Sequence, residues 1–188
     1  MQAFDFDNTI YKGESAFDFA LFVLKKRKRL LRYLPGIVKI LLDYKACRMS
    51  SDEYLERLNK YAPIFLENKE FIQKLVVEFW KKNEHKLYPH ILEKITPEDF
   101  IITSSPYFLL EPIMEKLNTT HFICSEANLD EGKMTYLNFK ENKVKKFVEK
   151  IGKKKITNFY TDSYNDKPMM DYAEHVFLIT KGKIEKIK

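Results

Sequence analysis

Three clusters of polar side chains stand out in the sequence, and each directly follows a short apolar run. They are Asp5-Phe6-Asp7-Asn8-Thr9, Thr103-Ser104-Ser105 and Asp162-Ser163-Tyr164-Asn165-Asp166. Four of these residues are carboxylates, and carboxylates that lie a few ångströms apart repel one another unless a cation lies between them. A hard divalent cation such as Mg²⁺ suits oxygen ligands. If the fold brings the clusters together, the sequence predicts a magnesium site.

A phosphate ester would complete such a site. Asp5 and Asp7 stand two residues apart at the end of an extended segment, so their side chains point the same way. One carboxylate can then attack phosphorus while the other handles a proton. Lys143 opens a predicted helix and adds positive charge against the phosphate dianion, as Mg²⁺ would. These residues predict phosphoryl chemistry with a nucleophile and an acid/base partner.

The first half of the chain predicts one strand followed by helices. Residues 2–6 alternate apolar and polar side chains, which is typical of a strand, and from Ser15 to about Ile95 apolar residues recur every three or four positions. Ser50 and Glu53 form a capping box within this block, and Pro35-Gly36 predicts a break or kink. We expect three or four helices and no strand between residues 15 and 95.

After Thr96-Pro97 the predicted elements alternate between strands and helices. The predicted strands are 100–102, 122–124, 157–160 and 176–179, the helices are 107–117, 142–151 and 168–172, and a hairpin passes through 130–132. This order predicts an α/β fold with a doubly wound, mainly parallel sheet, whose strand ends carry the three clusters. We expect a core of residues 1–14 and 96–188, with residues 15–95 inserted after the first strand as an all-helical cap.

The chain resembles the haloacid dehalogenase superfamily of phosphohydrolases, within its phosphoserine-phosphatase-like branch. Residues 5–9 match the first motif of the family, residues 100–106 resemble the second, Asn142-Lys143-Val144-Lys145 resembles the third, and residues 162–166 match the fourth. All four occur in family order. The resemblance implies a Rossmann-like core and hydrolysis of a phosphate monoester. Asn8, where the family often has Gly, stands in a turn that Asn tolerates.

The resemblance also implies catalytic roles. Asp5 would form an aspartyl-phosphate, and Asp7 would protonate the leaving alcohol and then activate water. Thr103 and Ser104 would bind the phosphate, and Lys143 would steady its charge.

The implied metal site contains Asp5, Asp7, Asp162 and Asp166. Asp5 and Asp162 would ligate Mg²⁺, Asp7 would add its backbone carbonyl, and Asp166 would act from behind them. Dehalogenases of the superfamily lack the second aspartate, so the presence of Asp7 favours phosphate transfer. The transport ATPases of the superfamily would need membrane helices that this sequence lacks.

Two assignments stay open at this point. Lys140 and Lys145 are neighbours of Lys143 and are alternatives for the lysine of the third motif. Glu14 stands where phosphoserine phosphatases carry a substrate-binding glutamate, but Glu56 stands where they carry an arginine. A small phosphorylated metabolite is therefore expected, with phosphoserine disfavoured.

The positive charge of the chain is concentrated in one segment. Residues 25–48 carry nine cations and one anion, whereas the rest of the chain carries 24 cations and 26 anions. The cluster Lys25-Lys26-Arg27-Lys28-Arg29 lies between apolar stretches, a pattern that can bind an anionic membrane surface. Residues 142–151, 162–163 and 176–184 are also similar to bacterial phosphatidylglycerophosphate phosphatases of the same branch, so a lipid phosphate is the other substrate class.

Two rival functions remain on the sequence alone. The first is a non-catalytic module that docks on a membrane or a nucleic acid through the basic segment, although no recognised nucleic-acid module accompanies that segment. The second is a phosphotransferase or phosphomutase, which passes the phosphate to a second substrate. The retention of all four aspartates favours an enzyme.

Length and composition limit the remaining possibilities. The chain has 188 residues, 45% of them hydrophobic, which suits one compact domain with an inserted subdomain. Cys47 and Cys124 fit neither a disulfide framework nor a zinc site, so we expect a reducing, cytoplasmic environment. No export leader is evident, and Arg32 and Lys39 interrupt the best apolar run. The oligomeric state is left open.

Overall fold

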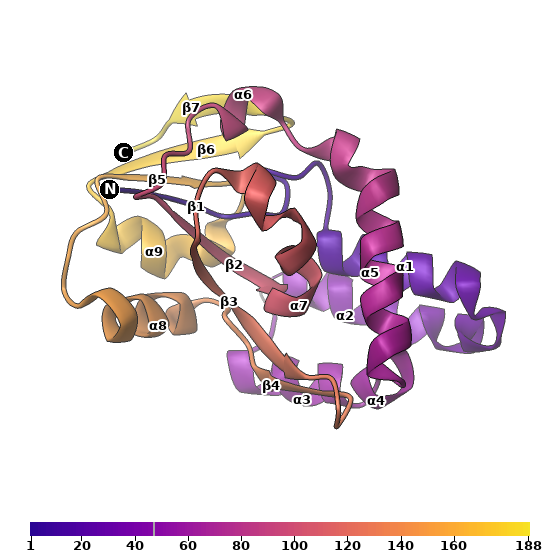
Figure 1. Cartoon of the computed structure of the whole chain (residues 1–188). Coiled ribbons are helices and arrows are strands. Elements are labelled where there is room, and N and C mark those ends of the chain that lie inside the picture. Colours follow the sequence, from indigo (N-terminus) through magenta and orange to yellow (C-terminus); the bar gives the residue numbers. More distant parts are fainter. Residues whose placement is uncertain (47) are drawn as a thin grey trace.

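The computed structural model describes residues 1–46 and 48–188, so Cys47 lies outside the described residues. In this part of the chain, seven strands form one sheet in the order β4-β3-β2-β1-β5-β6-β7 (Figure 1). The strands are β1 (Gln2–Phe4), β2 (Phe100–Pro106), β3 (His121–Asn128), β4 (Lys133–Tyr136), β5 (Asn158–Thr161), β6 (His175–Thr180) and β7 (Lys183–Lys186). The five central strands are parallel and the two edge strands are antiparallel. The predicted mainly parallel α/β fold is confirmed.

The helical block between β1 and β2 contains more helices than predicted. Its helices are α1 (Ser15–Lys26), α2 (Leu34–Lys45), α3 (Ser51–Asn59), α4 (Ala62–Phe65), α5 (Lys69–Asn83) and α6 (Pro89–Leu92), with 3₁₀ turns η1 (Lys28–Tyr33) and η2 (Glu84–Lys86). Pro35, Pro63 and Pro89 each open a helix at its first turn, where the missing N–H costs nothing. The expected break at Pro35 is confirmed. Ser50 Oγ accepts a hydrogen bond from Glu53 N at 3.2 Å, which confirms the predicted cap of α3.

The second half departs from the predicted elements in two places. The helix predicted for residues 107–117 is α7 (Tyr107–Leu110) followed by the 3₁₀ helix η3 (Glu111–Leu117), because Pro112 has no N–H for an α-helical bond. The C-terminal strand β7 was not predicted, because it is short, mostly charged and at the sheet edge. Lys181 and Gly182 both have positive φ, which suits the tight turn between β6 and β7. Helices α8 (Glu141–Ile151) and α9 (Lys167–Tyr172) lie where helices 142–151 and 168–172 were expected, and a short 3₁₀ turn, η4 (Tyr164–Asp166), precedes α9.

The first strand is shorter than predicted. It ends at Phe4, and the carbonyl of Phe6 then accepts hydrogen bonds from the N–H groups of Ile10 and Tyr11 at 2.8 and 2.9 Å. Asn8 adopts φ 55° within this turn, a conformation in which Asn is tolerated. The turn carries the first polar cluster out of the sheet and onto its carboxyl edge.

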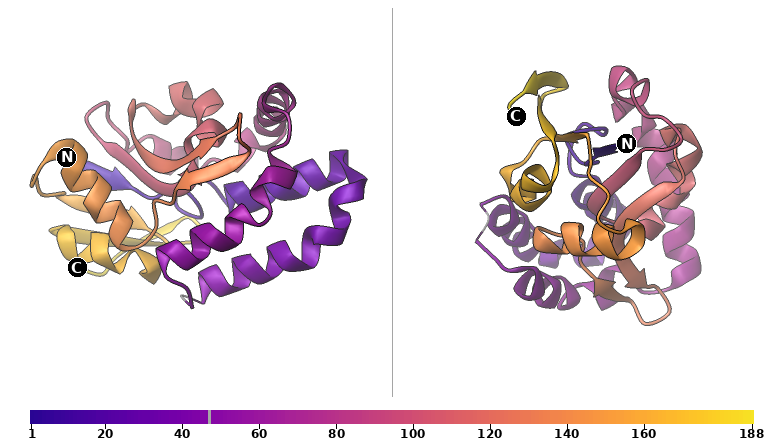
Figure 2. Two further views of the ribbon diagram at one scale, coloured as in Figure 1. Left: turned by 90° about the horizontal axis from the view of Figure 1, so that it is seen from below. Right: turned by 90° about the vertical axis from the view of Figure 1, so that its left-hand side faces the viewer.

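Alternating side chains of the parallel strands fill two apolar layers. On one face, Ile102 and Phe159 pack with Phe147 of α8 and Met169 of α9. The other face belongs to a larger cluster with residues of α1, α5 and α7. Figures 1 and 2 show α8 and α9 together on one side of the sheet, and α1, α2 and α3 gathered beyond the carboxyl ends of the strands.

The helical block and the sheet share the larger apolar cluster, which joins Phe4 and Ile101 to Phe19 and Phe79. The division into a core of residues 1–14 and 96–188 and a cap of residues 15–95 stays a prediction. None of the helices in the described residues has the length and hydropathy needed to cross a bilayer.

Asp99 joins the starts of the two strands that carry the first two polar clusters. Its Oδ1 accepts a hydrogen bond from Gln2 N at 2.7 Å, and its Oδ2 accepts from Thr96 N at 2.9 Å and from Thr96 Oγ1 at 3.0 Å. The residue is 2% exposed. This buried carboxylate thus links the start of β1 to the turn that precedes β2.

We predict that Asp99→Ala lowers the free energy of unfolding by about 2–4 kcal/mol, because it removes several hydrogen bonds to one buried carboxylate. Urea denaturation measures the change. Asp130→Ala is the matched control, since Asp130 is exposed and pairs only at the surface with Lys69, and we expect a change within about 0.5 kcal/mol. Equal effects of the two substitutions would contradict the role of Asp99.

Candidate active site

A buried lysine joins the first and last polar clusters. Lys143 Nζ lies 2.8 Å from Asp5 Oδ1 and 2.6 Å from Asp166 Oδ1. Thr161 Oγ1 donates to the other oxygen of Asp166 at 2.8 Å. All four residues are buried. The lysine therefore holds one oxygen of Asp5, whereas Asp166 is fully engaged behind it.

Asp7 is held by two serines from different elements. Ser105 Oγ, on β2, donates to Asp7 Oδ2 at 2.7 Å, and the backbone N–H of Ser15, at the start of α1, donates to Asp7 Oδ1 at 2.6 Å. The two serine hydroxyls lie 2.8 Å apart and share a hydrogen bond. The side chain of Asp7 is therefore fixed by both the sheet and the helical block.

A cavity of about 180 Å³ lies at the carboxyl edge of the sheet, between these two arrangements. Its lining residues are Asp5, Asp7, Glu14, Tyr44, Ser104, Asp162, Ser163 and Asn165. They come from all three polar clusters, from helix α2 and, in the case of Glu14, from the residue that precedes α1. The predicted convergence of the clusters at one edge is present in the structure.

Three aspartates of this cavity, Asp5, Asp7 and Asp162, have pKa values above that of an isolated aspartate. Burial raises the pKa of Asp5 well above its usual value, and Asp166 and Asp162 raise it further against the opposing effect of Lys143. Burial, followed by the charge of Glu14, raises the pKa of Asp7 to about 6. Burial and the charges of Glu14, Asp166 and Asp7 raise the pKa of Asp162 to about 7. The cluster thus carries more negative charge than Lys143 neutralises.

This excess of negative charge fits a divalent cation. Asp5 and Asp162 both line the cavity and offer carboxylate oxygens, the ligand type that Mg²⁺ prefers. Among the described residues, no three Asp, Glu, His or Cys side chains are arranged as a complete ligand set. Mg²⁺ needs no such set, because it keeps several waters and binds through one or two carboxylates together with substrate phosphate.

The structure separates the three candidate lysines. Lys143 contacts Asp5 and Asp166, whereas Lys140 Nζ donates to the backbone carbonyl of Met49 at 2.8 Å, and Lys145 is exposed. Of the three, Lys143 is the one that reaches the carboxylates.

The hydroxyl cluster divides between the cavity and the protein interior. Ser104 lines the cavity, and its Oγ donates to the carbonyl of Asn138 at 3.0 Å. Thr103 is 1% exposed, is not among the cavity-lining residues, and accepts a hydrogen bond from Ser105 N at 3.0 Å. Glu14 lines the cavity and accepts a hydrogen bond from Asn8 Nδ2 at 2.8 Å.

Several residues near the site were not singled out from the sequence. Ser105 and Ser15 hold Asp7, and Tyr44 and Asn165 line the cavity. Ser105 was part of a recognised cluster but carried no assigned role. Ser15 and Tyr44 belong to helices α1 and α2. No local sequence pattern indicates how these helices pack against the sheet.

Solved structures with the same fold are distant in sequence. A protein of unknown function from Bordetella pertussis Tohama I is 16% identical, with a TM-score of 0.70 over 94% of this chain and 87% of that one. A phosphoserine phosphohydrolase-like protein from Francisella tularensis subsp. tularensis SCHU S4 is 20% identical, with a TM-score of 0.60 over 94% and 86%. Phosphoserine phosphatase from T. onnurineus is 18% identical, with a TM-score of 0.58 over 94% and 81%.

No curated protein matches the sequence. A family model described as haloacid dehalogenase-like hydrolase matches residues 3–171. The predicted membership is confirmed, and the chain belongs to the haloacid dehalogenase-like hydrolase family.

Proposed function

We propose that the protein is a Mg²⁺-dependent phosphatase that hydrolyses a phosphate monoester through an aspartyl-phosphate on Asp5. The observation that carries the proposal is the environment of Asp5, which lines the same cavity as Asp7 and has one oxygen held by buried Lys143. Membership of the haloacid dehalogenase-like hydrolase family and the phosphoserine phosphatases among the structures with this fold support it.

In the proposed reaction, the two aspartates act in sequence. Asp5 Oδ2 is the oxygen that Lys143 does not hold, and it attacks phosphorus as the bond to the ester oxygen breaks. Asp7 gives a proton to the leaving alkoxide and then takes one from the water that attacks the aspartyl-phosphate. The raised pKa of Asp7 suits both steps, because a group that titrates near the working pH can donate and accept protons.

The remaining residues of the site stabilise charge and position the phosphate group. Lys143 offsets the charge on Asp5, and the Ser104 hydroxyl at the cavity wall is available to a phosphate oxygen. Bound Mg²⁺, held by Asp5, Asp162 and the backbone carbonyl of Asp7, would supply positive charge to the phosphoryl oxygens. Thr103 and Asp166 lie behind the cavity and would support it from there.

The cavity favours some substrates over others. The residues that line it in the described chain include no arginine, and Glu56, at the position where phosphoserine phosphatases carry one, is an exposed residue of α3 that pairs with Lys60. A substrate carboxylate would therefore lack a cationic partner, which disfavours phosphoserine. A phosphotransferase remains the alternative, and it differs in passing the phosphate to a second substrate.

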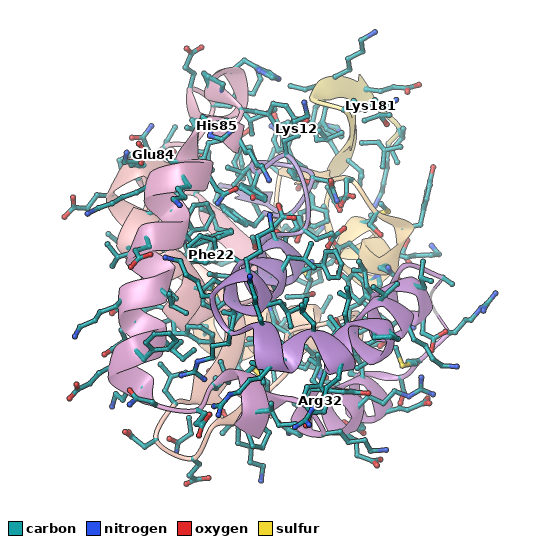
Figure 3. All side chains as sticks on the ribbon, turned by 90° about the vertical axis from the view of Figure 1, so that its right-hand side faces the viewer. Lys12, Phe22, Arg32, Glu84, His85 and Lys181 are labelled. Atoms are coloured by element: carbon teal, nitrogen blue, oxygen red, sulfur yellow. The ribbon has the colours of Figure 1, made fainter. Side chains whose placement is uncertain are left out.

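The basic segment lies away from the cavity, at the turn between α1 and η1. Lys26 pairs with Glu78 at 2.7 Å, and Arg27 and Arg29 pair with Glu67 at 3.5 and 2.8 Å, so much of its charge is already offset. Figure 3 shows this side of the molecule, with Phe22 on α1 and Arg32 on η1 labelled. A peripheral contact with an anionic membrane stays a prediction, as does a cytoplasmic location, and a non-catalytic docking role is disfavoured by the assembled carboxylates.

We predict that the wild-type protein hydrolyses p-nitrophenyl phosphate with Mg²⁺ and that Asp5→Asn lowers kcat by roughly a thousandfold or more, because it removes the nucleophile at nearly unchanged volume. Release of p-nitrophenol measures the rate. Asp130→Asn, at an exposed position, is the matched control. Full activity of Asp5→Asn in a folded protein would disprove the proposed mechanism.

We predict that Ser105→Ala lowers kcat about 10- to 100-fold with little change in KM, because Asp7 loses a hydrogen bond to a charged group worth about 1.5–3 kcal/mol. Steady-state kinetics separate the two constants. Ser50→Ala is the control, since it removes the α3 cap at a cost of about 1 kcal/mol of stability and leaves the site intact. A rise in KM at constant kcat would argue against the positioning of Asp7.

We predict that Mg²⁺ raises the melting temperature of the protein and that Asp162→Asn reduces the rise. At a concentration 100-fold above Kd, the ion adds about 2.7 kcal/mol of stability. Because Asp162 must lose its proton to ligate and its pKa is about 7, the rise should be larger at pH 8 than at pH 6. Differential scanning fluorimetry tests this, with EDTA and Asp130→Asn as controls, and an equal rise in Asp162→Asn would count against the assigned ligand.

A further inference from the structure

Two further cavities adjoin the carboxylate cavity and lead away from it into the helical block. The first, of about 140 Å³, shares Asp7, Glu14, Tyr44 and Ser104 with the carboxylate cavity. The second, of about 180 Å³, shares lining residues from α1, α2 and α3 with the first. A path of shared walls therefore runs from the proposed phosphate site to the interior between these helices.

The walls of this path change from charged to apolar along its length. The cavity that does not share Asp7 or Glu14 is lined mainly by aliphatic and aromatic side chains, and Ser104 and the tyrosines Tyr54 and Tyr61 supply its side-chain hydroxyls. Ala16 and Ala20 stand four residues apart on α1, so both lie on one face of the helix. Opposite them are Ile37 on α2 and Leu58 on α3. Because the side chains of Ala16 and Ala20 are small, they leave a space between α1 and the larger side chains of Ile37 and Leu58.

The path has no means of recognising a second charged group on a ligand. Among the described residues, no lysine, arginine or histidine lines any of the three cavities, and their acidic residues lie at the phosphate end. A polar alcohol would lose its hydration against apolar walls without gaining hydrogen bonds. An apolar chain would instead bury its surface against these walls.

We propose that the substrate is a phosphate monoester whose alcohol carries an apolar chain, and that this chain lies between α1, α2 and α3 while the phosphate lies at Asp5. The proposal rests on the proposed phosphatase function and names its substrate class. One site for an anion lies next to one apolar path, so the cavities suit a ligand with a phosphate at one end and an apolar chain at the other.

A homologous series of n-alkyl phosphates from butyl to decyl, each below its critical micelle concentration, tests the proposal. We expect kcat/KM to rise up to about fourfold for each added methylene until the path is filled, since each buried methylene contributes about 0.8 kcal/mol. A flat or falling dependence on chain length, with all esters turned over, would overturn the apolar path and leave the phosphatase function standing.

Replacing either of two alanines with leucine tests where the apolar chain binds. Ala20→Leu fills the shared wall of the two inner cavities, and we expect it to lower the ratio of kcat/KM for decyl phosphate to that for butyl phosphate at least tenfold. Ala46→Leu, at the exposed end of α2, should leave this ratio unchanged. The ratio is internal to each variant, so a general loss of activity does not alter the outcome. An unchanged ratio in Ala20→Leu would place the chain elsewhere.

A binding measurement can show whether the apolar path is wrong or the proposed phosphatase function is wrong. Isothermal titration of the Asp5→Asn variant with butyl and decyl phosphate requires no turnover. If decyl phosphate binds at least tenfold more tightly than butyl phosphate and the wild type hydrolyses neither, the apolar path stands and the phosphatase function fails. Equal affinities for the two esters would overturn the apolar path whatever the wild type hydrolyses.

Discussion

The structure depends on a single buried cation held between two carboxylates. Lys143 lies within 2.8 Å of both Asp5 and Asp166, and all three side chains are nearly inaccessible to water. The loss of one partner from such a group costs about 3–5 kcal/mol, because the remaining charge stays buried. The contact joins α8 to the residue that follows β1 and to η4, which follows β5, and it orients the proposed nucleophile, Asp5.

The sheet could be predicted from sequence because its signal is local. Ile101 and Ile102 belong to a continuous apolar run and face opposite apolar layers, as a strand buried on both faces requires. The missed features have a different origin. β7 is a charged edge strand whose pairing with β6 depends on a turn at Lys181-Gly182, and the additional helices of the block begin at prolines that also serve as breaks.

Only those residues of the candidate site that lie at the ends of strands could be predicted from the sequence. Asp5, Asp7, Ser104 and Asp162 follow strands or lie near their ends, and the parallel sheet carries them to one cavity without further information. The hydrogen bond between Ser15 and Asp7 depends instead on how α1 approaches the sheet, which is a matter of tertiary packing. Lys143 is an intermediate case, because the resemblance favoured it, but only burial beside Asp5 and Asp166 distinguishes it from Lys140.

Helix α1 contacts both Asp7, the proposed acid/base residue, and the cavities that adjoin it. Its first residue, Ser15, donates its backbone N–H to Asp7, and the next residue, Ala16, together with Ala20 one turn further along, borders the apolar cavities. The N-terminus of a helix carries partial positive charge, so this contact favours the ionised form of Asp7, which opposes the effect of burial on its pKa. A displacement of α1 by a ligand in the cavities would therefore alter the length of this hydrogen bond and the proton affinity of Asp7 together. The same helix that borders the cavities thus also contacts Asp7, the proposed acid/base residue.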